Sequence, residues 1–427
     1  MALFSPYRAV LRTPHACGAL AASLAGRLCY GVVSLSLILT LTAGGRGYKF
    51  AGLVSALFGL AVVLLSPFRA RLIDQRGPRR ALPPMAAGFA TALVAIAVIP
   101  AHSDVNDAVI AMLALAAGAC APPLGVVMRT LWSELARDHD VLQAAYSLDG
   151  VAEELLYVAG PVITGVITLV TTPAAGLLVS AALAVAGTGF FLRSPALRRW
   201  PAPVAGPRSG VPDTAPGEAG AGRALLVVAL VTGAIGLCLG GFGLVMVAFS
   251  QARHDPAAAA WIEAALSVGS ALGGLGYGAV AWRMSAQRRL ALLATGLAAI
   301  LVPAALSTGL LVLALVTGLA GVLVSPALAT AYVLADGLAA PAARTRAGNW
   351  VNTGYNAGAS AGAVLSAQLV GRLPLSACLP VLATPALLAI VPLLRVRATP
   401  RAMRPVALYV PERDTEPPVA KAGDCDR

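Results

Sequence analysis

Twelve apolar segments, each roughly 20 residues long, follow one another along this sequence. A helix needs about 20 predominantly apolar residues to cross the hydrocarbon core of a membrane. Charged residues make up only 12% of the 427 residues, against about 25% in an ordinary globular domain. The sequence therefore predicts an all-α integral membrane protein with twelve transmembrane helices. The predicted spans cover residues 16–42, 50–68, 82–101, 108–129, 143–170, 174–192, 224–250, 257–282, 289–306, 309–334, 348–371 and 375–394.

A proline-rich segment separates the first six predicted spans from the last six. A segment of this composition does not build a hydrophobic core and is typical of a flexible linker. The last residues of the chain have the same character. We therefore predict an N-terminal six-helix bundle at 1–193, a linker at 194–222, a C-terminal six-helix bundle at 223–395 and a disordered tail at 396–427.

Lysine and arginine are distributed unequally between the two ends of the predicted spans. With the N-terminus inside, 26 of the 31 basic residues lie on the cytoplasmic side and four lie in the outer loops. This bias predicts that both termini are cytoplasmic. Only two of the basic residues are lysines, which favours a GC-rich bacterial genome and hence a bacterial plasma membrane. Because the basic residues are scattered between apolar runs, no nucleic-acid partner is expected.

The loop after the second predicted span carries a charged motif. Asp74 and Gly77 are followed by Arg79 and Arg80, and Arg71 precedes them. Together with the six-plus-six layout, this loop resembles the inner loop of the major facilitator superfamily of secondary transporters. The resemblance implies two pseudo-symmetric six-helix bundles in a monomer, with an inner gate at these five residues. Alternatively, the arginines only anchor the loop at the membrane surface.

A second charged group follows the tenth predicted span on the same side. Asp336 is followed by Arg344 and Arg346. An acid at the mouth of a transporter can pair with an arginine while a gate is shut, and the pair must break when the gate opens. Asp336 and Arg344 are therefore predicted to complete the inner gate. Ordinary interfacial charge is the alternative.

The fifth predicted span contains three carboxylates inside an apolar stretch: Asp149, Glu153 and Glu154. Tyr146 and Tyr157 share a helical face with the first two. A charge near the bilayer centre costs about 2.5–3.5 kcal/mol on insertion scales, so this face should line the bundle interior or a water-filled cavity. We predict that the acids couple transport to protons and that the tyrosines line the substrate cavity. Alternatively, Asp149 reaches the membrane surface and Glu154 pairs with a neighbour.

Arg27 is expected to be the only basic residue deep in a predicted span. It lies roughly 16 Å from the inner end of its span at 1.5 Å per residue, a depth similar to that of Glu153 and Glu154. In the fold that the resemblance implies, the first and fifth helices are neighbours. We therefore expect Arg27 to pair with Glu153 or Glu154 and to take part in proton coupling. A static ion pair that lets both residues insert is the alternative.

The eleventh predicted span repeats the pattern of the fifth with neutral side chains. At an offset of 203 residues, Asn352 aligns with Asp149 and Asn356 with Glu153. Amides hydrogen-bond a solute without carrying a proton, so Asn352 and Asn356 are predicted to line the substrate cavity. Hydrogen bonding between helices is the alternative.

A glycine–proline pair marks the outer half of the fifth span. Gly160-Pro161, followed three residues later by Thr164-Gly165, resembles a signature of the drug/proton antiporter branches. A second mark of those branches, an arginine midway along the fourth helix, is missing from the uncharged run 113–124. Close helix packing also explains small residues and a proline. The signature therefore favours export only in part.

No motif in the sequence indicates an enzyme, an ATP-driven pump or a metal site. It has neither a phosphate-binding G-K-[ST] loop nor an H-E-x-x-H motif, and its six cysteines are widely dispersed. We predict proton-coupled efflux of a small organic compound by alternating access, with the proton gradient in place of a cofactor. The expected partners are the lipid bilayer and an uncharged, weakly amphipathic substrate. Proton-coupled or facilitative uptake is the alternative, and a non-transporting membrane sensor is a more remote one.

Overall fold

A computed structural model describes residues 5–99, 105–136, 138–200, 216–254, 258–305, 307, 309–340, 343–370 and 372–395. In these residues all regular structure is helical, apart from one isolated bridge between Val370 and Leu373. The all-α prediction is confirmed. The helices are α1 (Ser5–Arg12), α2 (Ala16–Ala43), α3 (Tyr48–Leu64), α4 (Ser66–Arg76), α5 (Pro78–Val98), α6 (Asp107–Cys120), α7 (Leu124–Leu135), α8 (His139–Val170), α9 (Pro173–Arg193), the 3-10 helix η1 (Pro195–Arg199), α10 (Pro216–Ala252), α11 (Ala258–Gly278), α12 (Ala286–Ala305), α13 (Leu310–Leu338), α14 (Arg344–Leu369) and α15 (Leu375–Arg395).

Each predicted span falls on one helix or on a pair of consecutive helices. Eight of the described helical segments are long and apolar enough to cross a membrane by themselves, or nine if the bent pair α3–α4 forms one span. Helix α14 is not among them, because its first turns carry Arg344 and Arg346 and its middle carries Asn352 and Asn356. A polar helix of this kind is stable in a membrane when other helices surround it.

The second and fourth predicted spans are each broken into two helices. Helices α3 and α4 meet at a bend of 42°, where Pro67 occupies the start of α4. Helices α6 and α7 are separated by Ala121, Pro122 and Pro123. Proline has no backbone N–H and clashes with the preceding turn, and Pro122 and Pro123 lie at this break between α6 and α7. The breaks create two short helices, α4 and α7, in the first bundle.

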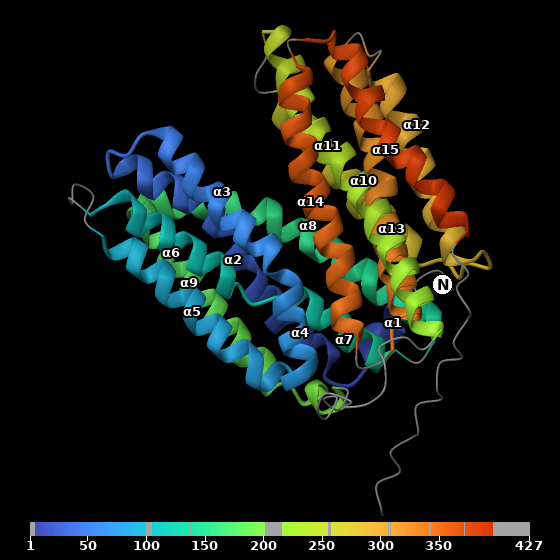
Figure 1. The fold of residues 1–427 in the computed structure, drawn as a ribbon, viewed down its shortest axis with the longest axis horizontal. Helices are drawn as coiled ribbons and strands as arrows, with labels where there is room; N and C mark the ends of the chain where they lie inside the picture. Colours follow the sequence, from blue (N-terminus) through green and yellow to red (C-terminus); the bar gives the residue numbers. More distant parts are fainter. Residues whose placement is uncertain are drawn as a thin grey trace, which may run out of the picture.

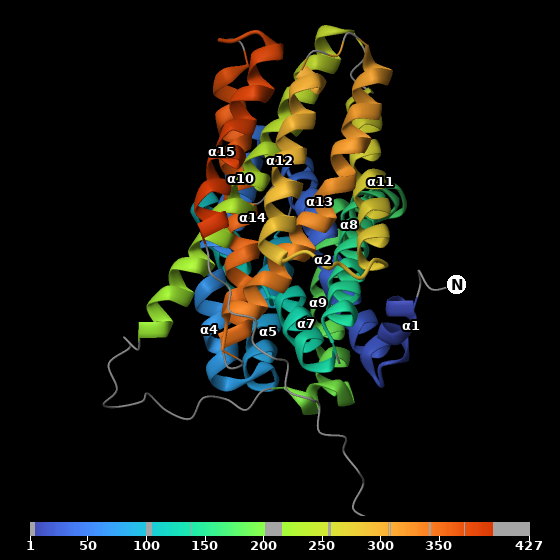
Figure 2. The same ribbon diagram turned by 90° about the vertical axis from the view of Figure 1, so that its right-hand side faces the viewer.

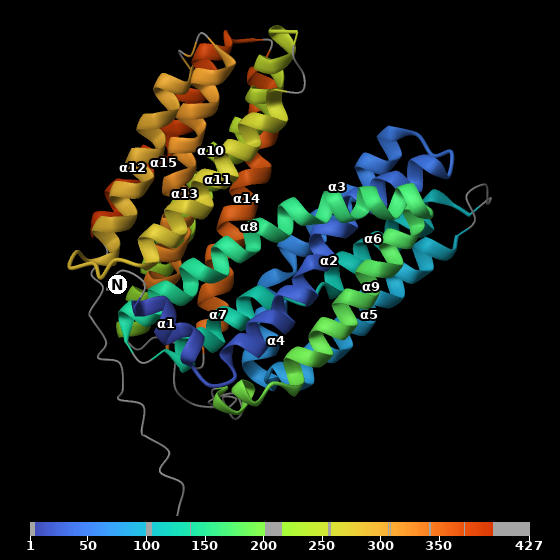
Figure 3. The ribbon, with the colours of Figure 1, turned by 180° about the vertical axis from the view of Figure 1, so that it is seen from behind.

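The helices form two bundles that meet at one end and diverge at the other. Helices α2 to α9 make the first bundle and α10 to α15 the second, and Figures 1 and 3 show them joined near α4, α7 and α14. We call this the terminal side, because α1 and the end of α15 lie there (Figure 2). On the opposite, distal side the ends of the two bundles are far apart (Figure 1).

Small residues let the helices within each bundle approach closely. A Cβ atom added to Gly240 of α10 would collide with the backbone of Ala359 of α14, and one on Gly273 of α11 would collide with Val322 of α13. Close backbone approach through small residues is the usual way in which membrane helices pack. The glycine clusters of the second half therefore serve helix packing.

The predicted linker and tail lie largely outside the described residues. Residues 201–215 and 396–427 are not described. Within the predicted linker, η1 follows α9 directly, and α10 begins at Pro216, so helical structure enters the linker at both ends. Helix α1 lies ahead of the first predicted span and packs against α8.

Candidate functional site

Four charged side chains form one cluster in the first bundle, and three of them are buried. Arg27 of α2 contacts Asp149 and Glu153 of α8, with Nη1–Oδ1 and Nη2–Oε2 distances of 2.7 and 2.8 Å. Arg129 of α7 contacts the same two acids, with an Nε–Oδ2 distance of 3.0 Å to Asp149 and an ion pair to Glu153. Arg27 is 4% exposed, Arg129 5% and Asp149 0%. Two guanidinium groups thus balance two carboxylates where burial of a single charge would be costly.

The partners of Arg27 differ in part from those the sequence predicts. Arg27 contacts Glu153, one of the two expected acids, and Asp149, but no ion pair joins it to Glu154 among the described residues. The possibility that Asp149 reaches the membrane surface is wrong, since this side chain is fully buried.

The expectation that Arg27 is the only basic residue deep in a span is wrong. Arg129 lies in the middle of α7, because the helix resumes after Pro123 and continues to Leu135. Pro122 and Pro123, followed by the apolar run at the start of α7, are the signal in the sequence that the fourth segment continues past residue 129. Arg69 and Arg289 are also buried.

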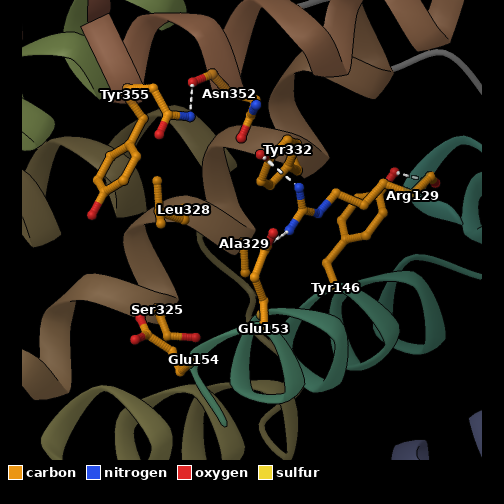
Figure 4. A pocket seen from close by; sticks show the side chains of 12 residues that line it. Arg129, Tyr146, Glu153, Glu154, Ser325, Leu328, Ala329, Tyr332, Asn352 and Tyr355 are labelled. Atoms are coloured by element: carbon orange, nitrogen blue, oxygen red, sulfur yellow. Dashed lines mark hydrogen bonds and ion pairs between the residues drawn. The ribbon is translucent and has the colours of Figure 1, made fainter. Parts of the chain in front are cut away.

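Arg129 links the cluster to the second bundle. Its Nη1 donates a hydrogen bond of 2.9 Å to the hydroxyl of Tyr332 on α13, and its guanidinium carbon lies 4.2 Å from the centre of that ring. Tyr146 of α8 is buried against Tyr332, with ring centres 6.0 Å apart, and its hydroxyl donates to the Arg129 carbonyl at 3.2 Å. Figure 4 shows these side chains converging from the two bundles.

Two adjacent pockets lie beside the cluster, between the bundles. The narrow pocket has a volume of about 120 Å³, and the wide pocket one of about 400 Å³. Arg129, Glu153, Asn352 and Asn356 line both. Three predicted cavity residues therefore line a pocket: Asn352 and Asn356 line both pockets, and Tyr146 lines the narrow one. Tyr157 lies on α8, and its side chain is outside the described part of the structure.

Glu154 also lines the narrow pocket, but its bonding partners differ from those of Glu153. The side chain of Glu154 accepts a hydrogen bond of 3.1 Å from Ser270 of α11, and Figure 4 shows it beside Ser325 and turned away from Arg129. Among the described residues no arginine or lysine forms an ion pair with it. The two neighbouring glutamates are thus separated into a paired and an unpaired carboxylate.

On the terminal side, ion pairs and hydrogen bonds hold the bundles together. Arg344 of α14 forms ion pairs with Glu134 of α7 and, at 3.3 Å, with Asp336 of α13. Asp74 of α4 accepts a hydrogen bond of 3.2 Å from the backbone N–H of Arg346. The predicted gate residues Asp74, Asp336 and Arg344 therefore lie at this contact. Glu134, which is not among the predicted gate residues, completes it.

The remaining residues of the predicted gate lie elsewhere. Arg71, Arg79 and Arg80 are exposed, and the described residues form no ion pair with them. Their positions favour the alternative of anchors at the membrane surface. Gly77 ends α4 and precedes α5 with φ 73° and ψ 158°, a conformation that side chains with a Cβ atom avoid. Its role is to make this turn.

Further hydrogen bonds cross the terminal side. Tyr7 of α1 donates to the carbonyls of Gly274 and Leu275 of α11, at 3.2 and 2.7 Å. Gln143 of α8 donates to Tyr277 at 3.0 Å, and Ser66 of α4 donates to Asn349. The second bundle is therefore held by four elements of the first half: α1, α4, α7 and α8.

Arg69 connects the two helix breaks of the first bundle. Its guanidinium donates to the carbonyls of Gly118 and Ala121, at 3.1 and 2.5 Å, and to that of Val62. These carbonyls lie at the C-terminal ends of α6 and α3, where helices leave acceptors unpaired. A cation at such an end is also favoured by the helix dipole. Arg69 therefore stabilises both breaks.

Comparison with known proteins identifies the fold. No protein-family model and no curated protein matches the sequence. The human organic anion transporter MFSD10 superposes with a TM-score of 0.66 at 17% identity, covering 89% of this chain and 99% of its own. A bacterial homologue of the iron transporter ferroportin in an outward-facing state gives 0.69 at 14% identity, covering 90% and 98%. The E. coli fucose:proton symporter FucP gives 0.66 at 12% identity, covering 89% and 98%.

At these identities the similarity is one of fold, and it extends over nearly the whole of each chain. The described residues contain no group of three or more histidine, cysteine or acidic side chains placed to hold a metal ion. The site is therefore a buried charge cluster beside two pockets, between two helical bundles. The chain is a multi-pass helical membrane protein with the major facilitator fold.

Proposed function

We propose that this protein is a secondary transporter that exports a small organic solute in exchange for protons. One observation carries the proposal: pockets lined by buried charges lie between two bundles that touch on one side only. Binding at the interface of two repeated halves, near the membrane midplane, is the general logic of alternating access. The solved transporters with the same fold support it as well.

We assign the terminal side to the cytoplasm of a bacterial cell. Arg69, Arg129 and Arg289 are buried and no longer count as loop charges, but 23 of the 26 basic residues remain on that side. The positive-inside rule therefore still favours cytoplasmic termini. With this orientation, the bundles are closed toward the cytoplasm and apart toward the outside. One chain forms both pockets, so a monomer is sufficient for transport.

Glu154 is the proposed proton carrier. Glu153 is held between two guanidinium groups, which favour its ionised form throughout a cycle that leaves the cluster intact. Glu154 has only a neutral partner, Ser270, across the interface, and it lines the narrow pocket. A carboxyl group at such a position can accept a proton when the pocket opens outward and release it when the bundles rearrange.

In our proposal, the direction of transport follows from the position of Glu154 beside a pocket that opens to the outside. A proton that enters from the outside reaches Glu154 in the conformation closed toward the cytoplasm, while the solute leaves by the same route. Gly160 of the antiporter-like signature packs against Gly31 of α2, so this part of the signature also has a structural role. Export is therefore proposed mainly from Glu154 and from the expected inward proton gradient.

Proton movement in inside-out vesicles tests the proposal. The vesicle interior is made acidic, a panel of drugs and metabolites is added, and proton release is followed with a pH-sensitive dye. We expect solute-dependent release from wild type, loss of release in Glu154→Gln, and retention in Asp107→Asn. The Asp107 side chain is 60% exposed and lines neither pocket, so it is the control acid.

Two results would overturn proton-coupled export. Absence of solute-dependent proton release across the panel would contradict it, and so would equal release from Glu154→Gln and wild type. Uptake of the same compounds without proton movement would then make facilitative transport the better assignment. Absence of any solute movement would favour a non-transporting role.

A further inference from the structure

The wide pocket carries more positive than negative charge. Arg27, Arg69 and Arg129 line it, and Glu153 is the one carboxylate among its lining residues. Including the buried Asp149, the group has three guanidinium groups and two carboxylates. The carbonyls at two helix ends offset the charge of Arg69, so it is the buried donors of the pocket that lack partners. The Nε atoms of Arg27 and Arg69 are buried and have no hydrogen-bond acceptor among the described residues. A buried donor without an acceptor is costly unless an anion or another acceptor joins it.

The N-terminal end of α7 faces the same pocket. Leu124, Gly125 and Val126 form the first turn of α7 and line the wide pocket. Within the described residues, the backbone N–H groups of Gly125 and Val126 have no acceptor. The guanidinium group of Arg27 lies directly against Gly125, since a Cβ atom there would be 3.2 Å from its Nε. A helix N-terminus and a guanidinium group side by side are an arrangement that binds anions.

Arg69 offsets the negative helix ends next to the break between α6 and α7, which leaves the N-terminal end of α7 as a positive end. Its guanidinium occupies the carbonyl ends of α3 and α6, so the negative ends of those helix dipoles are already neutralised. Within the part of the chain that the structure describes, the N–H end of α7 on the other side of the break has no such partner. In transporters with discontinuous helices, half-helix N-termini near the midplane point at anionic groups of the substrate.

From these contacts we infer that the solute is an organic anion, held in the wide pocket by Arg27, Arg129 and the N-terminus of α7. This inference rests on the proposed transport function and replaces the uncharged solute expected from the sequence. Phe58, Val62 and Val63 also line the pocket, so the anion carries an apolar body. The volume of about 400 Å³ lies within the range of small-molecule sites. A carboxylate on a small aromatic or aliphatic skeleton meets these conditions.

The test compares matched probes that differ only in charge. Benzoate, benzamide and benzamidinium share one ring and carry charges of −1, 0 and +1; hexanoate and hexanamide extend the series to an aliphatic body. Thermal unfolding of the purified full chain is measured with each probe, without a proton gradient. We expect at least one carboxylate to raise the unfolding temperature by about 2 °C or more at saturation, and its neutral or cationic counterpart to leave it unchanged.

A pair of variants locates the anion in the wide pocket. Ser34 lines this pocket, is exposed, and bonds only to the carbonyl of Tyr30 on its own helix. Ser34→Glu therefore adds a negative charge without disturbing a buried contact, and Ser34→Gln adds the same volume without charge. We expect Ser34→Glu to abolish the carboxylate-induced shift and Ser34→Gln to retain it.

Several outcomes would overturn the inference. A larger shift with the amide or the amidinium, no shift with any carboxylate, or equal carboxylate shifts in the two Ser34 variants would each do so. Because no gradient is present, the result is independent of proton coupling. If the protein binds carboxylates but releases no protons, only proton-coupled export is refuted. If only neutral compounds drive proton release, only the anionic nature of the solute is refuted.

Discussion

Arg129 and Tyr332 lie 203 residues apart in the sequence and touch across the bundle interface, with Nη1 2.9 Å from the tyrosine hydroxyl. The same offset aligns Asp149 with Asn352 in the fifth and eleventh predicted spans. The separation of Arg129 and Tyr332 thus equals the offset between the fifth and eleventh predicted spans. Their contact joins α7 of the first bundle to α13 of the second.

The Arg129–Tyr332 contact should contribute measurably to stability. Tyr332→Phe keeps the ring below the guanidinium and removes the acceptor, so we expect a loss of about 1.5–3 kcal/mol, typical of a hydrogen bond to a charged group. Tyr332→Leu also removes the ring contact and should lose about 0.5–2 kcal/mol more. Thermal unfolding in detergent measures both. Equal unfolding temperatures for Tyr332→Phe and wild type would contradict the hydrogen bond.

Removal of one cation from the buried cluster should be strongly destabilising. Arg27→Met leaves two carboxylates with a single guanidinium, and breaking a buried pair in this way typically costs about 3–5 kcal/mol. The double variant Arg27→Met, Asp149→Asn restores the balance and should recover much of the loss. The yield and unfolding temperature of purified protein are the readouts.

An exposed acid provides the control for Arg27. Asp107 forms an ion pair of 3.0 Å with Arg46, and its side chain is 60% exposed; pairs with such an exposed partner contribute about 1 kcal/mol or less. Asp107→Asn should therefore leave the unfolding temperature nearly unchanged. If Asp107→Asn and Arg27→Met destabilised equally, burial of the cluster would not be the cause.

The terminal-side contact should control access to the narrow pocket. Arg344→Gln leaves Glu134 and Asp336 without their shared cation, which favours separation of the bundles on that side. The readout is the labelling rate of Ser325→Cys by an impermeant maleimide in inside-out vesicles, with the native cysteines replaced by serine. We expect a severalfold increase, since each 1.4 kcal/mol lost from the closed state changes the equilibrium tenfold.

Arg79 serves as the control for this gate. Arg79 is exposed on the same side, and no ion pair joins it to another described residue. Arg79→Gln should leave the labelling rate of Ser325→Cys at the level of the parent. A gate that depends on surface charge alone would instead respond equally to the Arg79 and Arg344 substitutions.

The turn at Gly77 should not tolerate a side chain. With φ at 73° and ψ at 158°, Gly77→Ala is forced into a strained region at a cost on the order of 1–3 kcal/mol. Gly47 also precedes a helix, but its φ of −63° suits any residue, and a Cβ atom there meets no other atom. Unfolding temperatures should fall for Gly77→Ala and stay constant for Gly47→Ala; the reverse order would refute this role of Gly77.

Much of the helix layout follows from hydropathy alone, because apolar runs of membrane length specify helices directly. Helix breaks are harder to infer. Pro122 and Pro123 lie inside an apolar run, and hydropathy does not distinguish a kinked helix from two helices whose ends are held by a residue elsewhere. Arg69 holds both ends here, through backbone carbonyls that have no sequence signature.

The sequence indicates some members of the charge cluster but not Arg129. Three acids in an apolar span require an interior position, and the depth of Arg27 indicates one partner. Arg129 was missed because its depth depends on the break before α7. The different surroundings of Glu153 and Glu154 depend on Ser270 and on the orientation of the second bundle, which no local pattern contains.

The hydrogen bonds of Tyr7 to Gly274 and Leu275 span 267 and 268 residues of sequence, and they impose an order on the biogenesis of the protein. At about 5–20 residues per second, a ribosome needs roughly 15–50 s to reach the acceptors after Tyr7 has emerged. During that time α1 has no docking partner on α11. Helix α1 therefore makes its contact with the second bundle only after α11 has been synthesised.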